Sequence, residues 1–123
     1  MIHQNPLRIS IENLRLRTII GLHDWERKEK QDIVINVQLD LDGQTATTRD
    51  DIEETLDYKE LTKAIITEVE QSNFFLLEKL CDHLLQIAMT DARVMAARVR
   101  VDKPFALRFA DSVSVERSAE RAE

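Results

Sequence analysis

A regular alternation of apolar and polar residues over residues 33–41 constrains the fold of this chain more than any other feature. The odd positions are apolar from Ile33 to Leu41, and the even positions are polar apart from Val34. Because successive side chains of a strand point to opposite faces, a repeat of two predicts a strand with one apolar and one polar face. Such a strand is typical of an antiparallel sheet that is covered on one side.

A second alternation, over residues 7–20, changes phase along its length. Apolar residues occupy odd positions at Ile9 and Ile11, but even positions from Leu14 onward. A repeat of two changes phase only where an extra residue is inserted. We therefore predict a strand with a β-bulge at residues 12–13.

Two helical patterns follow a polar connection over residues 42–51. Asp57 is expected to cap the first helix, and residues 71–73 should end it. The second pattern begins at Phe74 and carries an apolar stripe at helical spacing. Its members are Leu77, Leu80, Cys81, Leu84 and Ala88. The short join predicts a helical hairpin.

Two further strands are predicted near the C-terminus, over residues 94–101 and around Val113 and Val115. The order is then ββααββ, an α+β domain with two helices on one face of an antiparallel sheet. In this interpretation residues 1–123 form a single domain, with residues 116–123 as a frayed, charged tail. Because the edge strands of such a sheet keep unpaired backbone groups, we expect a homo-oligomer.

Charge and composition argue against several classes of function. The net charge of −6 disfavours nucleic acid as a partner. No apolar run approaches the roughly 20 residues of a membrane span, and residues 1–6 do not resemble a secretory signal. Cys81 is the only cysteine and cannot form an internal disulfide, which suits the cytoplasm, where we expect the protein. Two glycines cannot build a glycine-rich phosphate loop.

Candidate metal ligands are sparse and poorly spaced. Cys81 and His83 are two residues apart in a predicted helix, so their side chains should diverge. His3 and His23 are too few to complete a three-histidine site. We therefore predict no metal site, and we expect Cys81 to be a small core residue.

Glu78 lies at the border of the apolar stripe, where a carboxylate needs a partner. No basic residue stands three or four positions further on, and Asp82, four positions on, repels it. Glu78 either turns outward into water or meets a cation or donor, such as a ligand.

Lys103 continues the odd-numbered apolar phase of the strand before it, and Pro104 should end that strand. A lysine at an apolar strand end loses hydration, which favours the neutral amine. Lys103 is therefore a candidate general acid or base. The alternative is a lysine whose ammonium group reaches back to water.

Two more residues are candidates for a site. Tyr58 stands at a helix entrance, where its hydroxyl could project into a cleft; the alternative is a core tyrosine with a hydrogen-bonded tip. Glu26 follows the only tryptophan, Trp25, in a charged loop. Loops often carry function, although Glu26 could equally be one more solvated charge.

Five stretches together resemble the dihydroneopterin aldolase and epimerase family of pterin biosynthesis. They are Ile20-Gly21 with Asp24-Trp25-Glu26, residues 31–37, Thr55-Leu56-Asp57-Tyr58, Leu76-Leu77-Glu78-Lys79-Leu80, and Asp102-Lys103-Pro104 with Ala106-Leu107-Arg108. Each is weak alone, but five in the right order over nearly the whole chain are specific. The resemblance implies a tunnelling fold, in which ββααββ subunits form a barrel-like tetramer and two tetramers usually stack into an octamer. It places the active sites between subunits.

The resemblance also implies which residues bind the heterocycle. Glu78 would bind the guanidine-like edge of the pterin, helped by the backbone at Leu77. Tyr58 would approach the ring from the neighbouring subunit, and the backbone at Leu56 and Asp57 would help to seat the pterin.

The implied chemistry needs no cofactor, no metal and no lysine Schiff base, because the dihydropterin imine accepts the electrons. Lys103 would transfer the protons, and Glu26 would contact the polyol side chain or an ordered water. Loss of the 2′-hydroxyl proton breaks the C1′–C2′ bond of 7,8-dihydroneopterin, giving 6-hydroxymethyl-7,8-dihydropterin and glycolaldehyde. If the aldehyde turns over and adds back, the 2′ centre inverts.

The resemblance divides between two branches. Residues 14–18 and 106–114 resemble the epimerases of dihydroneopterin triphosphate, whereas residues 24–26 and 103–104 resemble the aldolases. Three arginines could bind a triphosphate: Arg15, Arg17 and Arg108. For Arg15 and Arg17 the alternative is a solvated face of the strand. We expect aldolase activity of folate biosynthesis with accompanying epimerisation. The alternatives are a dedicated triphosphate epimerase and a non-catalytic, pterin-binding oligomer.

Overall fold

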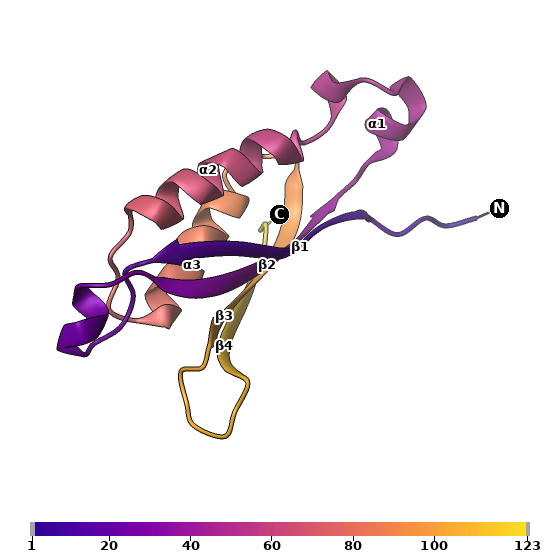
Figure 1. Cartoon of the computed structure of the whole chain (residues 1–123). Coiled ribbons are helices and arrows are strands. Elements are labelled where there is room, and N and C mark those ends of the chain that lie inside the picture. Colours follow the sequence, from indigo (N-terminus) through magenta and orange to yellow (C-terminus); the bar gives the residue numbers. More distant parts are fainter. Residues whose placement is uncertain (1, 123) are drawn as a thin grey trace.

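The computed structural model describes residues 2–122 as a four-stranded antiparallel sheet with two main helices on one face (Figure 1). The elements are β1 (Leu7–Thr18), η1 (Asp24–Arg27), β2 (Gln31–Leu41), α1 (Gln44–Arg49), η2 (Ile52–Glu54), α2 (Tyr58–Gln71), α3 (Leu77–Ala88), β3 (Val94–Pro104) and β4 (Ser112–Glu120). The strands lie in sequence order, β1-β2-β3-β4. The α+β class and the ββααββ order are thereby confirmed. None of the described helices is both long and apolar enough to cross a membrane.

The helix-covered face of β2 is the centre of the core. Its odd-numbered residues are buried as predicted: Ile33, Ile35, Val37, Leu39 and Leu41. The apolar stripe of α3 packs on β3 and β4, while α2 packs on β1. Cys81 is buried in this core, where its Sγ donates to the Val99 carbonyl at 3.4 Å. It is the small core residue that the sequence predicts.

The predicted bulge in β1 is confirmed. The pairing of β1 with β2 shifts register between Ile11 and Leu14. Asn13 adopts a positive φ of 53°, and its N–H donates to the Asn36 side chain at 2.9 Å. The extra residue keeps the apolar side chains of β1 on the helix-covered face across the change of phase.

The start of α3 differs from the prediction. The helix begins at Leu77, after an extended Leu76, whereas the sequence pattern predicts helix from Phe74. The Phe74 carbonyl instead accepts hydrogen bonds from the Gly21 N–H at 3.3 Å and from Arg27 Nη1 at 3.1 Å. Donors that are distant in sequence therefore hold this segment out of the helix, and a local periodicity contains no information about them.

Two predictions of irregular structure were wrong. The polar connection over residues 42–51 contains α1, and η2 follows it. The tail that was expected to fray from residue 116 instead continues β4, which pairs with β3 up to Glu120. Arg121 then donates to three backbone carbonyl groups between residues 89 and 94. Backbone pairing and these bonds order a charged segment that carries no apolar pattern.

Candidate functional site

Lys103 and Glu26 form a buried ion pair, although 77 positions separate them in the sequence. Lys103 Nζ lies 2.5 Å from Glu26 Oε2, and the two side chains are 15% and 5% exposed. Pro104 is the last residue of β3, as predicted. Lys103 does turn to the packed side, but a carboxylate replaces the water that it loses. The alternative of a lysine reaching back to solvent does not apply.

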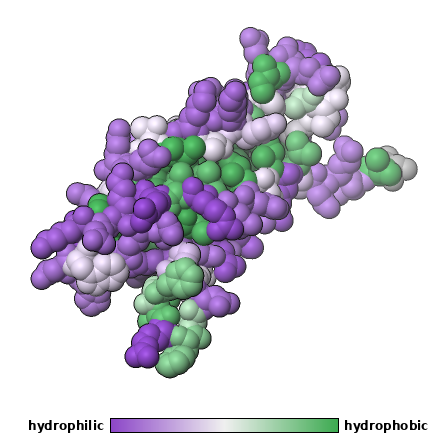
Figure 2. Space-filling view, viewed as in Figure 1, coloured by the Kyte–Doolittle hydropathy of each residue, from purple (hydrophilic) through white to green (hydrophobic). Residues whose placement is uncertain are grey.

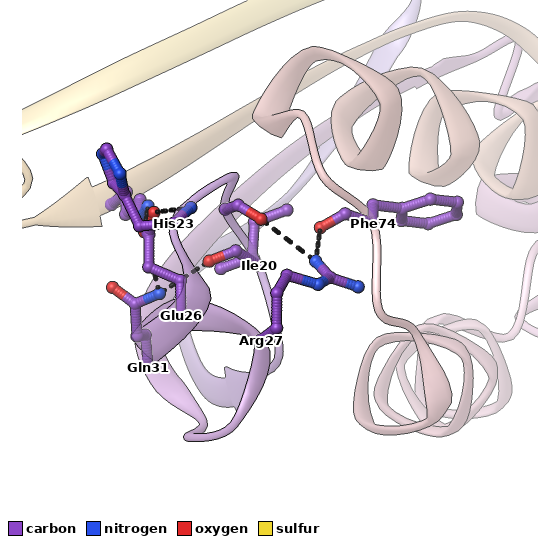
Figure 3. A network of polar contacts seen from close by, with 8 residues as sticks. Ile20, His23, Glu26, Arg27, Gln31 and Phe74 are labelled. Carbon is purple, nitrogen blue, oxygen red and sulfur yellow. Dashed lines mark hydrogen bonds and ion pairs between the residues drawn. The ribbon is translucent and has the colours of Figure 1, made fainter.

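Three donors of the same chain converge on the Glu26 carboxylate. The His23 N–H and Gln31 Nε2 each donate to it at 3.1 Å (Figure 3), in addition to Lys103. Burial alone would raise the pKa of Glu26, but the hydrogen bonds from Lys103, His23 and Gln31 outweigh burial and lower the pKa to about 2. Glu26 is thus a buried, fully ionised carboxylate and not one more solvated charge.

The carboxylate also depends on Gly21, for which the sequence analysis predicted no role. Gly21 has a φ of +129°, and a Cβ placed there would overlap the Glu26 carboxylate. Gln31 Nε2, which donates to that carboxylate, also donates to the Ile20 carbonyl at 2.6 Å. A signal for both existed: Gly21 is one of two glycines, and Gln31 is a polar residue at an odd-numbered position, just before the odd positions of β2 become apolar.

Glu78 and Leu77 lie in the first turn of α3, near this ion pair. Leu77 is 9% exposed and packs in the core, whereas Glu78 is exposed. Within residues 2–122, Glu78 makes no side-chain hydrogen bond or ion pair. The Phe74 carbonyl, just before α3, accepts a hydrogen bond from the N–H of Gly21, and Gly21 lies against the Glu26 carboxylate. Glu78 therefore lies at the same end of the sheet as Glu26, with its carboxylate free for another donor.

The start of α2 carries Leu56, Asp57 and Tyr58, at the end of the helix that lies away from η1. Asp57 caps the helix as predicted, since its carboxylate accepts from the N–H groups of the next turn. Tyr58 is 59% exposed, so it is not a core tyrosine. The 14 residues of α2 span about 20 Å, and the far end of the helix is bonded to Thr18 near η1 (Figure 1). One chain therefore does not bring Tyr58 to Lys103.

The candidate arginines of β1 project from the polar face of the sheet, whereas Lys103 projects from the helix-covered face. Arg17 is engaged, because it pairs with Asp32 at 3.1 Å and donates to the Lys30 carbonyl at 2.9 Å. Arg15 is exposed and makes no side-chain hydrogen bond or ion pair with the described residues. Both arginines line an open cavity at the strand ends, next to Pro104 and Phe105.

Arg108 lies in the turn between β3 and β4, which projects from the body of the protein (Figures 1 and 2). Its guanidinium carbon is 5.4 Å from the centroid of the Phe109 ring. Phe105, Leu107 and Phe109 are exposed in the same turn. Phe105 and Phe109 have positive φ values of 61° and 71°, so the turn holds two non-glycine residues in the left-handed region.

Cys81 and His83 diverge as predicted. Cys81 faces Val99, whereas His83 Nε2 lies 3.0 Å from Glu68 Oε2 at the surface between α2 and α3. Over residues 2–122, no group of three or more His, Cys, Asp or Glu side chains is placed to hold a metal ion.

Comparison with known proteins assigns the chain to a family. The family model of dihydroneopterin aldolase matches residues 9–118. The dihydroneopterin triphosphate 2′-epimerase of Escherichia coli (strain K12) is 48% identical over 113 residues, which cover 92% of this chain and 94% of that relative. The dihydroneopterin aldolase of the same strain is 27% identical over 107 residues, which cover 87% of this chain and 88% of that relative.

Solved structures agree with the sequence relatives. E. coli dihydroneopterin aldolase in complex with neopterin has a TM-score of 0.86 and 26% identity, covering 91% of this chain and 97% of that one. The Burkholderia thailendensis aldolase bound to guanine has a TM-score of 0.82 and 27% identity, covering 95% and 93%. The fold, the motifs and the family model agree over nearly the whole chain, which therefore belongs to the dihydroneopterin aldolase family.

Proposed function

We propose that this chain is an enzyme that inverts the 2′ carbon of dihydroneopterin triphosphate. One observation carries the choice of substrate: the identity is 48% to the E. coli triphosphate epimerase but 27% to the aldolase of the same strain. Cleavage of free dihydroneopterin, which the sequence analysis favoured, is supported by the family as a whole and is the second candidate. The residues 24–26 and 103–104 favour it.

In the proposed mechanism Lys103 moves the proton and Glu26 holds the polyol. A carboxylate whose pKa is lowered to about 2, because hydrogen bonds from Lys103, His23 and Gln31 outweigh its burial, is a very weak base near neutral pH. The Lys103 ammonium group of the ion pair first gives up its proton. The resulting amine then takes the 2′-hydroxyl proton as the C1′–C2′ bond breaks, and the electrons enter the dihydropterin imine. The released aldehyde rotates and presents its other face. The enamine carbon C1′ attacks that face, and Lys103 returns the proton to the 2′ oxygen.

The exposed Glu78 is the proposed anchor for the heterocycle. A pterin edge offers two aligned N–H donors, and such a pair with a carboxylate is among the stronger hydrogen-bonded contacts. The backbone at Leu77 would add a further contact. Because the length of α2, about 20 Å, lies between Tyr58 and the end of the helix that meets Thr18 near η1, we propose that Tyr58, Leu56 and Asp57 act in the site of a neighbouring protomer. The working protein is then a homo-oligomer, a tetramer or an octamer.

Two arginines are candidates for the triphosphate. Arg15 and Arg108 make no ion pair with the described residues, whereas Asp32 already neutralises Arg17. A guanidinium group matches the geometry of phosphate oxygens. Arg15→Ala or Arg108→Ala should therefore raise KM for the triphosphate and leave KM for free dihydroneopterin unchanged.

Parallel incubation with dihydroneopterin and with its triphosphate tests the proposal. We expect the 2′-epimer of the triphosphate as the main product, separated chromatographically from 6-hydroxymethyl-dihydropterin. Faster formation of the hydroxymethyl product from free dihydroneopterin would favour the aldolase. Conversion of neither substrate would indicate a non-catalytic pterin-binding protein. Activity should survive a chelator, and borohydride should trap no adduct, because the mechanism uses neither a metal nor a Schiff base.

A further inference from the structure

Arg27, at the end of η1, binds the segment that leads into α3 (Figure 3). Its Nη1 donates to the carbonyls of Gly21 and Phe74, each at 3.1 Å. Its Nη2 donates to the Asn73 carbonyl at 2.5 Å. The guanidinium carbon also lies 4.1 Å from the centroid of the Phe75 ring. All the polar contacts of this guanidinium are thus made to backbone carbonyls of its own chain.

These carbonyls belong to the two segments that carry the two ends of the proposed site. Gly21 packs directly against the Glu26 carboxylate. Residues 73–75 run straight into the first turn of α3, which bears Glu78. A planar guanidinium with five donors can hold several acceptors in fixed relative positions. Arg27 therefore fixes the segment at the ion pair relative to the segment at the anchor.

Few hydrogen bonds join the two segments directly, although Thr18 just before the first segment bonds to Ser72 just before the second. Three hydrogen bonds connect residues 20–27 with residues 73–75 in the described chain. Arg27 donates two of them, and the Gly21 N–H donates the third to Phe74 at 3.3 Å. The Glu78 side chain makes no polar contact with Glu26 or with Lys103. Arg27 therefore supplies most of the polar link between these two segments, in addition to the packing of α3 on β3.

From these contacts we infer that Arg27 is a positioning residue of the reaction. It sets the distance between the Glu78 carboxylate, which anchors the flat heterocycle, and the Glu26–Lys103 pair, which acts on the C1′–C2′ bond. Arg27 itself touches no reacting atom. The inference rests on the proposed function, because it needs one substrate that spans both ends of the site.

Arg27→Gln tests this role, with Arg27→Lys as the conservative variant. A misplacement of about 1 Å can lower turnover by roughly a hundredfold, so we expect kcat of Arg27→Gln to fall by about 10- to 100-fold. The affinity for a pterin that lacks the polyol should stay at the wild-type value, because Glu78 is untouched. Arg27→Lys should recover only part of kcat, since an ammonium group cannot hold three carbonyls in one plane.

Arg121→Gln is the matched control. Arg121 also donates to three backbone carbonyls, at 3.0, 2.7 and 3.1 Å, but it does so near the C-terminus. We expect Arg121→Gln to lower the melting temperature as Arg27→Gln does, while its kcat stays at the wild-type value. If the wild type is active but the two Gln variants have equal kcat, the inference is wrong and the proposed function still stands. A wild type that converts neither substrate would overturn the proposed function and the inference with it.

Discussion

The two glutamates of the proposed site, Glu26 and Glu78, lie in opposite environments. Glu26 is 4% exposed, and although burial raises its pKa, hydrogen bonds from Lys103, His23 and Gln31 lower it to about 2. Glu78 is exposed and accepts no hydrogen bond from the rest of residues 2–122. In the proposed site the reacting end is therefore assembled within one protomer, whereas the anchoring end is open to donors that residues 2–122 do not supply.

The contrast between the two glutamates predicts its largest effect at Lys103, because turnover should require the amine beside the buried Glu26. Lys103→Ala should lower turnover by about 10²- to 10⁴-fold, the usual contribution of general acid–base catalysis. Pterin binding at Glu78 should be kept, as measured by fluorescence titration beside steady-state kinetics. Lys103→Met, which keeps the aliphatic stem, should show the same loss. Lys63→Ala, at an exposed lysine of α2, should change neither quantity. Wild-type turnover in Lys103→Ala would contradict catalysis at this pair.

Glu78→Gln tests whether the exposed glutamate serves binding and not stability. A hydrogen bond to a charged group contributes about 1.5–3 kcal/mol, so we expect Kd for a pterin to rise by about 10- to 100-fold. The melting temperature should not change, because Glu78 has no partner among the described residues. Calorimetric titration and thermal unfolding measure the two effects. Glu70→Gln, at an exposed glutamate of α2, is the control. A large loss of stability in Glu78→Gln would mean that this carboxylate has a structural role.

Gly21→Ala tests how tightly the buried carboxylate is packed. The added Cβ would overlap Glu26, and the φ of +129° is unfavourable for alanine. We expect a loss of about 2 kcal/mol in the free energy of unfolding, together with reduced turnover. Gly43→Ala is the matched control, because Gly43 has a φ of +73° and faces Leu7 far from the ion pair. It should lose stability and keep its turnover. An unchanged turnover in Gly21→Ala would argue against a catalytic need for this geometry.

The smallest expected effect is the pH dependence that Glu26 contributes. Burial raises its pKa, but the hydrogen bonds from Lys103, His23 and Gln31 lower it from 4.5 to about 2 in the folded protein. As the pH falls below 4.5 the unfolded chain takes up the proton first, so stability falls with pH until the folded pKa is reached. The contribution is complete near neutral pH, and about 1 kcal/mol of it should be lost by pH 4.

Urea unfolding of the wild type and of Glu26→Gln at pH 7 and pH 4 measures this contribution. The variant should lose less stability than the wild type over that interval, because it lacks the titrating carboxylate. Asp91→Asn provides a second comparison, because Arg93 bonds to Asp91 and likewise lowers the pKa of that carboxyl. Equal losses in wild type and Glu26→Gln would show that the ion pair does not couple to stability.

Sequence reasoning found the regular elements but placed some of their limits wrongly. The phase change at residues 12–13 located the bulge, and Asp57 located the start of α2. Residues 74–76 were assigned to a helix, yet Arg27 and Gly21 bind the Phe74 carbonyl and the segment is not helical. The short α1 helix was missed because its six residues are polar and carry no apolar periodicity.

The sequence alone indicates which faces are buried, because a repeat of two or of 3.6 residues is a local property of the chain. It also marked Lys103, Glu26 and Glu78 as charges in unusual places. The pairing of Lys103 with Glu26 across 77 positions follows only from the folded structure, as does the lack of a hydrogen-bond or ion-pair partner for the Glu78 side chain within residues 2–122. Contacts between distant segments depend on strand register and loop packing, and no local pattern of residues encodes either one.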